Sequence, residues 1–123
     1  MKTTQARMIA GIMGLSGVAF GAFGAHILKA HLDRLGTEEF WQKGVLYHLV
    51  HAVVLLLIST WKPVPRLAFY LIFAGIFLFS GSFYALALTY ARWIGAITPL
   101  GGLGFLFGWL ALIFSLKDEK SGP

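Results

Sequence analysis

Residues 67–91 read LAFYLIFAGIFLFSGSFYALALTYA and contain no Asp, Glu, Lys or Arg. A helix that crosses the hydrocarbon core of a bilayer needs about 20 predominantly apolar residues, so this stretch is long enough to span a membrane. Three further uncharged runs, at about residues 8–28, 44–61 and 93–116, meet the same requirement. Strands of a membrane β-barrel are only about 9–11 residues long and alternate in polarity. The sequence therefore predicts an all-α fold, an integral membrane four-helix transmembrane bundle.

The composition supports the lipid bilayer as the main partner of the chain. The 123 residues are 58% hydrophobic and 12% charged, whereas an ordinary soluble domain is about 25% charged. The net charge of +5 comes from Lys and Arg residues scattered between the apolar runs. Because they form no basic stripe, we expect no nucleic-acid partner. The absence of cysteine from the sequence excludes disulfide exchange, thiolate metal sites and iron–sulfur clusters.

The loops predict how the spans are connected. Gly36 is expected to end the first helix and Thr37 to cap the second, so helices 1 and 2 form a long hairpin. The first run is longer than the core of a usual signal peptide and is expected to be retained. We predict a single domain over residues 1–116, followed by a short polar tail at 117–123.

The distribution of basic residues predicts the orientation of the spans. With four spans, both termini lie on one side of the membrane, together with the second loop. That side carries six Lys and Arg residues, and the opposite side carries four. By the positive-inside rule, both termini are expected in the cytoplasm.

Glycines are concentrated in the first and fourth runs. Small residues let membrane helices approach closely, so these positions are predicted to be helix-packing sites. The packing lies either inside the bundle, which we favour, or between copies in an oligomer. The glycines concerned are Gly14, Gly17, Gly21, Gly24, Gly101, Gly104 and Gly108.

Histidine, tyrosine and hydroxyl side chains are predicted to lie at one depth of the bundle. His51 is about seven residues inside the start of the second run, or roughly 10 Å at 1.5 Å per residue, and Tyr84 is at a similar depth on the third helix. In a hairpin that turns near Gly36, His26 is expected to approach Tyr47 and His48. The predicted polar layer comprises His26, Tyr47, His48, His51, Ser80, Ser82, Tyr84 and Thr98, with Pro99 beside it.

Three interpretations of the polar layer remain open. Polar side chains in hydrocarbon are costly unless paired, so the layer can be a structural hydrogen-bond network. Alternatively, it receives a proton, an ion or a small molecule, because ionisable groups inside a membrane are often functional. A metal or haem site at His26, His48 and His51 is the third interpretation. Pro99 is expected to kink or unwind the fourth helix at the same depth.

Several short motifs, taken in order, resemble one known family. They are Gly21-Ala22-Phe23-Gly24-Ala25-His26, Tyr47-His48 with His51-Ala52, Phe79-Ser80-Gly81-Ser82-Phe83-Tyr84, Ile97-Thr98-Pro99-Leu100-Gly101-Gly102 and Gly108-Trp109. The chain is similar to the small bacterial membrane proteins grouped as domain of unknown function 423, which are related to the eukaryotic transmembrane protein 256. Phe83 stands where the family pattern leads us to expect Leu. The resemblance implies a multi-pass protein of the bacterial inner membrane and supplies no activity or catalytic residue.

We therefore expect a non-enzymatic scaffold, accessory or oligomeric membrane protein, a homo-oligomer or a subunit of a membrane complex, with a structural His/Tyr/Ser layer and no cofactor. The first alternative is a binding or transport protein that uses His26, His51 and Tyr84 for a small molecule, a proton or an ion. The second is a haem- or metal-binding membrane protein. Four-helix proton-coupled exporters depend on an intramembrane carboxylate, and none of the four runs contains one.

Overall fold

In the computed structural model, which describes residues 1–115, four helical segments are long and apolar enough to cross a membrane. They are Thr3–Ala25, Glu38–Ile58, Arg66–Thr89 and Arg92–Ser115. The predicted all-α membrane bundle is therefore confirmed. The polar tail predicted at 117–123 lies outside the described residues.

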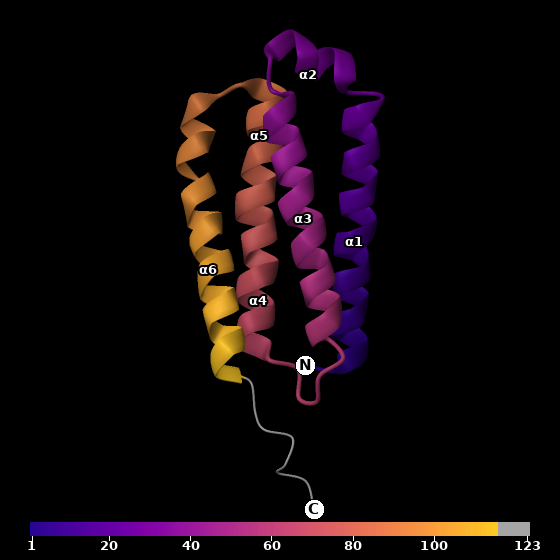
Figure 1. Cartoon of the computed structure of the whole chain (residues 1–123), viewed down its shortest axis with the longest axis vertical. Coiled ribbons are helices and arrows are strands. Elements are labelled where there is room, and N and C mark those ends of the chain that lie inside the picture. Colours follow the sequence, from indigo (N-terminus) through magenta and orange to yellow (C-terminus); the bar gives the residue numbers. More distant parts are fainter. Residues whose placement is uncertain (116–123) are drawn as a thin grey trace, which may run out of the picture.

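The spans lie side by side in a flattened bundle (Figure 1). Helix α1 (Thr3–Ala25) packs mainly against α3 (Glu38–Ile58), and α3 packs against the third span. The third span consists of α4 (Arg66–Gly75), the π-helical turn η1 (Ile76–Ser80) and α5 (Gly81–Thr89). The fourth consists of the 3₁₀ turn η2 (Arg92–Ala96) and α6 (Thr98–Ser115), and α6 packs on α4 and η1. The two inner spans therefore provide most of the helix–helix interfaces.

The connection between the first two spans differs from the predicted hairpin turn. Helix α1 ends at Ala25, and a separate short helix, α2 (Lys29–Leu35), crosses the end of the bundle opposite the N-terminus (Figure 1). His26 takes φ −126° and ψ −77°, which breaks the helical path. The turn lets Leu32 reach full burial beside Trp41, Tyr84 and Ala87. Burial of this leucine gives a physical reason for the break.

Gly36 and Thr37 connect α2 to α3, so Gly36 ends the short helix α2 and not the first span as predicted. Gly36 ends α2 with φ +69°, a left-handed conformation that glycine adopts without steric cost. Thr37 precedes α3 but makes no side-chain cap hydrogen bond. Its hydroxyl instead donates to the Ala87 carbonyl oxygen on α5 at 2.6 Å. Thr37 therefore joins this loop to the third span.

Pro99 does not kink the middle of the fourth helix. It is the second residue of α6, where a missing backbone N–H removes no hydrogen bond from the helix. The irregular backbone precedes it, because the span begins as the 3₁₀ turn η2 and becomes α-helical only at Thr98. The break lies on the N-terminal side of Pro99, at Ile97.

Most of the predicted packing glycines lie inside the bundle. On α1, Gly17 faces Leu49 of α3, and Gly24 lies directly against the Trp41 ring. Gly21 faces Val45 on the same interface. Gly14 is different, because a Cβ there would meet no atom of the described chain within 4 Å. It lies away from the α1–α3 contact and has no packing partner among the described residues.

The glycines of α6 bring that helix close to the third span. Gly101 meets the backbone of η1 at Leu78 and Phe79, and a Cβ on Gly104 would lie 3.3 Å from the Gly75 Cα. Gly108 lies against Ile72 of α4. A side chain at Gly101 would have no space, because its nearest neighbour is backbone.

Two apolar clusters divide the interior along the membrane normal. The larger lies toward the start of α1 and the end of α6, and the smaller lies under α2. The larger includes Ala6, Ala10, Met13, Ala52, Leu55, Ile58, Ala68, Phe69, Ile72, Ile76, Phe105 and Leu112. The smaller contains Leu32, Trp41, Tyr84 and Ala87, with Phe20 against it. Along α1, α3 and the third span, the residues between the two clusters include Ser16, His48, His51, Ser80 and Ser82.

Candidate functional site: the polar layer between the helices

His48 is the residue through which α3 bonds to two neighbouring spans. Its Nδ1 lies 2.8 Å from the Tyr84 hydroxyl on α5, and its Nε2 lies 3.1 Å from the Ser16 hydroxyl on α1. The Ser16 hydroxyl also donates to the Met13 carbonyl oxygen at 3.0 Å. His48 is buried with only 4% of its surface exposed. Both of its ring nitrogens are therefore occupied by protein partners.

Only one direction of donation satisfies this group completely. The Ser16 proton is given to Met13, so the Ser16 oxygen accepts from a protonated Nε2 of His48. Nδ1 of His48 then has a lone pair and accepts from the Tyr84 O–H. The tautomer follows from this pairing, since a neutral imidazole has one donor and one acceptor nitrogen.

His51, one helical turn further along α3, bonds in the opposite sense. Its Nδ1 lies 2.8 Å from the Tyr47 carbonyl oxygen, which can only accept, so Nδ1 carries the proton. The Trp109 indole N–H on α6 donates to Nε2 of His51 at 3.1 Å. The His51 ring also stacks on Phe105 with a centroid separation of 3.7 Å. This pair joins α3 to the fourth span.

Ser82 and Thr98 form the third contact of the polar layer. Their hydroxyl oxygens are 2.6 Å apart, and Ser82 donates to the Phe79 carbonyl oxygen at 2.8 Å. Thr98 is therefore the donor toward Ser82. The bond joins α5 to the first residue of α6, beside Pro99.

Ser80, in the π-helical turn, is fully buried, and among the described residues its hydroxyl has no hydrogen-bond partner. Tyr84, one turn later, reaches His48, whereas Ser82 faces Thr98. The three residues are close in sequence, but they face different neighbours. The predicted single layer is therefore a set of separate contacts around α3 and α5.

Tyr47 and His26 take positions other than those expected. Tyr47 is 39% exposed and packs its ring 4.7 Å from that of Phe79. His26 is exposed at the end of α1, and within residues 1–115 its side chain has no hydrogen-bond partner. The expected approach of His26 to Tyr47 and His48 is wrong. The α1–α3 register sets Gly17 opposite His48 and Gly24 opposite Trp41, so His26 is level with the start of α3.

Three partners in these contacts were not among the predicted site residues: Ser16, Trp109 and Trp41. Ser16 is the one hydroxyl residue in the first uncharged run, and this could have identified it as a polar contact of the first helix. Trp109 offers a single N–H in an otherwise apolar part of the fourth run. Trp41 is buried, and its indole N–H donates to the Phe20 carbonyl oxygen on α1 at 2.8 Å. Two of the four Trp residues thus donate an indole N–H from one span to another.

In the described part of the chain, no three His, Cys, Asp or Glu side chains come together as a set of metal ligands. His26 is separated from the other two histidines of the suggested metal or haem site. A metal at His48 or His51 would have to displace Tyr84, Ser16, Trp109 or a backbone carbonyl from a ring nitrogen.

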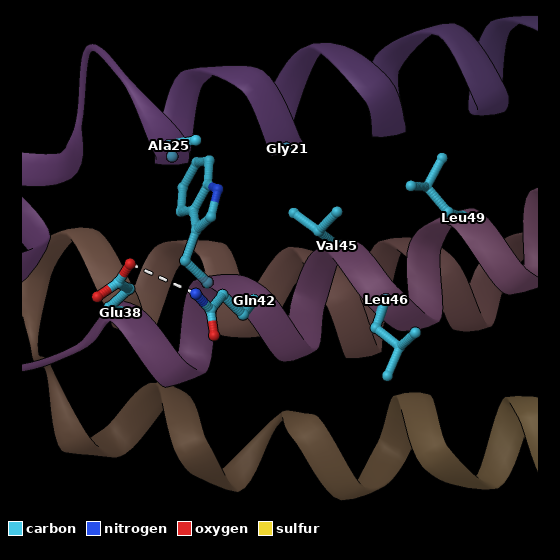
Figure 2. Close-up of a pocket in the computed structure, with 9 residues that line it drawn as sticks. Gly21, Ala25, Glu38, Gln42, Val45, Leu46 and Leu49 are labelled. Atoms are coloured by element: carbon cyan, nitrogen blue, oxygen red, sulfur yellow. Dashed lines mark hydrogen bonds between the residues drawn. The ribbon is translucent and has the colours of Figure 1, made fainter.

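An open groove of about 350 Å³ runs between α1 and α3 toward the α2 end (Figure 2). Its walls are mainly apolar, and Glu38 and Gln42 lie at its α2 end. The lining residues are Gly21, Gly24, Ala25, Glu38, Trp41, Gln42, Val45, Leu46 and Leu49. We call this the α1–α3 groove. His48, His51 and Tyr84 are not among its lining residues.

Charged side chains meet at the α2 end of the groove. Lys29 Nζ lies 3.3 Å from Asp33 Oδ2 and 3.4 Å from Glu38 Oε1. Gln42 donates to the same Glu38 oxygen at 3.4 Å. The hydrogen bond and charge of Asp33, followed by the charge of Glu38, raise the pKa of Lys29. Lys29 therefore remains a cation over the physiological range.

The chain matches a family described as "Protein of unknown function (DUF423)" over residues 20–102. It is 44% identical over 102 residues to the UPF0382 membrane protein SH2409 of Staphylococcus haemolyticus, covering 80% of this chain and 83% of the relative. It is 39% identical over 112 residues to the UPF0382 membrane protein YwdK of Bacillus subtilis, covering 86% and 90%.

The UPF0382 inner membrane protein YgdD of Escherichia coli is 34% identical over 123 residues, covering 94% of this chain and 92% of the relative. No solved structure matches the chain. The predicted location in the bacterial cytoplasmic (inner) membrane is confirmed by these relatives. The chain is a multi-pass membrane protein that belongs to the DUF423 family.

Proposed function

We propose that this protein is a non-enzymatic scaffold or accessory subunit of the membrane, in which the His/Tyr/Ser side chains hold the spans together. The observation that carries the proposal is the complete pairing of His48 and His51. All four of their ring nitrogens bond to other parts of the protein, and the partners come from α1, α5 and α6 as well as from α3. A site that accepts protons or ligands needs a free donor or acceptor, and these two rings offer none.

The pairing also supports a structural role on energetic grounds. An unpaired polar group in hydrocarbon costs several kcal/mol, so each bond is more favourable than leaving its partner alone. The bonds connect α3 to each of the other three spans at a level between two apolar clusters. Leu, Val and Phe provide no such directional contacts. The layer therefore fixes which helix faces meet and at what height.

The test is thermal and chemical unfolding of the purified protein in a mild detergent. His48→Ala and His51→Ala should each lower the free energy of unfolding by about 2 kcal/mol, because each removes two hydrogen bonds and leaves partner groups unpaired where no water replaces them. His26→Ala is the matched control and should leave stability unchanged, since His26 is exposed. The same samples are measured over a pH range and with added monovalent and divalent cations.

A structural layer predicts the same response to cations in wild type and in His51→Ala. Acid should destabilise the wild type more than His51→Ala, because a second proton on the paired His51 ring breaks its bond to Trp109. If an added cation stabilises the wild type and His51→Ala abolishes that response, the protein binds or transports the ion. If His48→Ala and His51→Ala are both as stable as the wild type, the two histidines do not hold the spans together and the proposal is wrong.

A further inference from the structure

The α1–α3 groove has the dimensions of a site for one lipid tail. Its lining on α3 extends from Glu38 to Leu49, which is about 16 Å at 1.5 Å per residue. The hydrocarbon core of a bilayer is about 30 Å thick, so this length corresponds to one leaflet. The groove lies between two spanning helices, and its apolar part therefore meets acyl chains rather than water.

The shape of the groove follows from small residues on one wall. Gly21, Gly24 and Ala25 carry at most a methyl group, whereas Val45, Leu46 and Leu49 of α3 form the opposite wall (Figure 2). Gly17 and Gly24 of α1 lie against Leu49 and Trp41 of α3, which brings the two helices close together. The hollow thus lies beside a closely packed part of the α1–α3 interface.

The polar end of the groove complements a headgroup that has both charges. Glu38 is the first residue of α3, and its side chain is 37% exposed. Its two hydrogen-bond donors, Lys29 and Gln42, are both at 3.4 Å and both use Oε1. Among the described residues, the second carboxylate oxygen of Glu38, Oε2, has no hydrogen-bond partner. Lys29, which is half exposed, lies beside it as a cation.

We propose that the α1–α3 groove binds a single phospholipid with a primary ammonium headgroup, of the phosphatidylethanolamine type. The acyl chain lies along Ala25 and Leu49, the ammonium group donates to Glu38, and the phosphate lies near Lys29. A carboxylate and an ammonium group form a charge-assisted hydrogen bond, which is stronger than a bond between neutral groups. A choline headgroup, whose nitrogen has no N–H, cannot make it. The proposal is independent of the polar layer, whose histidines do not line the groove.

The experiment uses the full-length protein, purified in a mild detergent and stripped of lipid. It is titrated with dioleoyl phosphatidylethanolamine or dioleoyl phosphatidylcholine, and the bound fraction is measured from the intact mass of the complex. We expect one ethanolamine lipid per chain, bound about tenfold more tightly than the choline lipid. Equal binding of the two lipids would overturn the headgroup assignment.

Two pairs of variants test the position of the lipid. Ala25→Leu fills the groove and should weaken binding of the ethanolamine lipid at least about tenfold, whereas Ala22→Leu, on an exposed part of α1 outside the groove, should not. Glu38→Gln should remove the preference for ethanolamine over choline, and Glu39→Gln should retain it. Unfolding without lipid checks that the variants are folded. Wild-type binding by folded Ala25→Leu would overturn the proposal.

Discussion

His48 and His51 lie one turn apart on the same helix, yet their partners require opposite tautomers. His48 donates from Nε2 and accepts at Nδ1, because Ser16 accepts and Tyr84 donates. His51 donates from Nδ1 and accepts at Nε2, because the Tyr47 carbonyl oxygen accepts and the Trp109 indole donates. A second proton on either ring would place two donors against each other. Each ring is therefore specified by its partners to be neutral.

The Tyr84 hydroxyl provides a test with a conservative change. Tyr84→Phe removes the donor to Nδ1 of His48 and leaves a buried acceptor unpaired, so the free energy of unfolding should fall by about 1 kcal/mol. Tyr47→Phe is the matched control, because the Tyr47 ring is partly exposed and among the described residues its hydroxyl has no hydrogen-bond partner. Unfolding in detergent measures both. Equal loss in the two variants would mean that the Tyr84–His48 bond contributes nothing specific.

At this scale the sequence predicted the depth of the polar residues better than their partners. Counting from the ends of the uncharged runs brought His48, His51 and Tyr84 to one level, and the structure bonds His48 to Tyr84. The sequence pointed to His26 as the partner from the first helix, whereas the structure places Ser16 against His48. The partner depends on the register between α1 and α3, which is set by close packing at Gly17 and Gly24. Register is a property of two surfaces and has no signal in either helix alone.

Among the elements, α6 and the π-helical turn η1 pack backbone against backbone. The Gly101 Cα faces the η1 backbone at Leu78 and Phe79, and the Phe105 ring lies against Gly75. A π-helical turn widens the helix by one residue and shifts the faces that follow it. After η1, Tyr84 faces α3 while Ser82 faces Thr98. The turn thus helps to distribute the polar side chains between two neighbours.

Neighbouring glycines of α6 allow this contact to be tested with one added methyl group. Gly101→Ala should lower the free energy of unfolding by about 3 kcal/mol, because its Cβ would overlap backbone that cannot move aside. Gly102→Ala should change it by less than about 0.5 kcal/mol, since its Cβ would lie 3.7 Å from the Phe79 ring, an ordinary contact. Unfolding in detergent distinguishes them. Similar stability of the two variants would contradict the described α6–η1 packing.

The four spans could be predicted from the uncharged runs, because length and hydropathy alone decide which segments cross a bilayer. Helix α2 could not be. It has seven residues, too few to show a clear helical period, and it forms because Leu32 is buried against Trp41 and Tyr84. The start of α6, at Thr98 and not at residue 93, could not be predicted for a related reason. Pro99 indicated a break, but whether a proline kinks a helix or begins one depends on the backbone before it.

For the whole molecule, the flattened arrangement leaves the outer faces of α1 and α6 to the lipid. Leu15 of α1 and Phe114 of α6 are 74% and 80% exposed, which would be unfavourable in water but is favourable in hydrocarbon. Inside, the polar contacts lie between a large apolar cluster near the start of α1 and the end of α6 and a small one under α2. The interior of the bundle is therefore different at the levels of the two membrane leaflets.

The orientation of the chain can be tested because the sequence contains no cysteine. Ala30→Cys places a thiol on α2, and Thr60→Cys places one near the loop at the opposite end; both positions are exposed, and neither change alters a charge. With the termini in the cytoplasm, as the basic residues predict, a membrane-impermeant maleimide should label Ala30→Cys in intact cells. Thr60→Cys should react only after the inner membrane is permeabilised. The reverse pattern would show that the termini face outward.

¹⁵N NMR of the histidine rings, in the detergent-solubilised protein at pH 7, reports directly which ring nitrogens carry protons. His48→Gln and His51→Gln assign the signals. If the polar layer is a closed network between helices, both buried rings are neutral, with His48 protonated at Nε2 and His51 at Nδ1. An imidazolium at either position, or the same tautomer at both, would contradict the account.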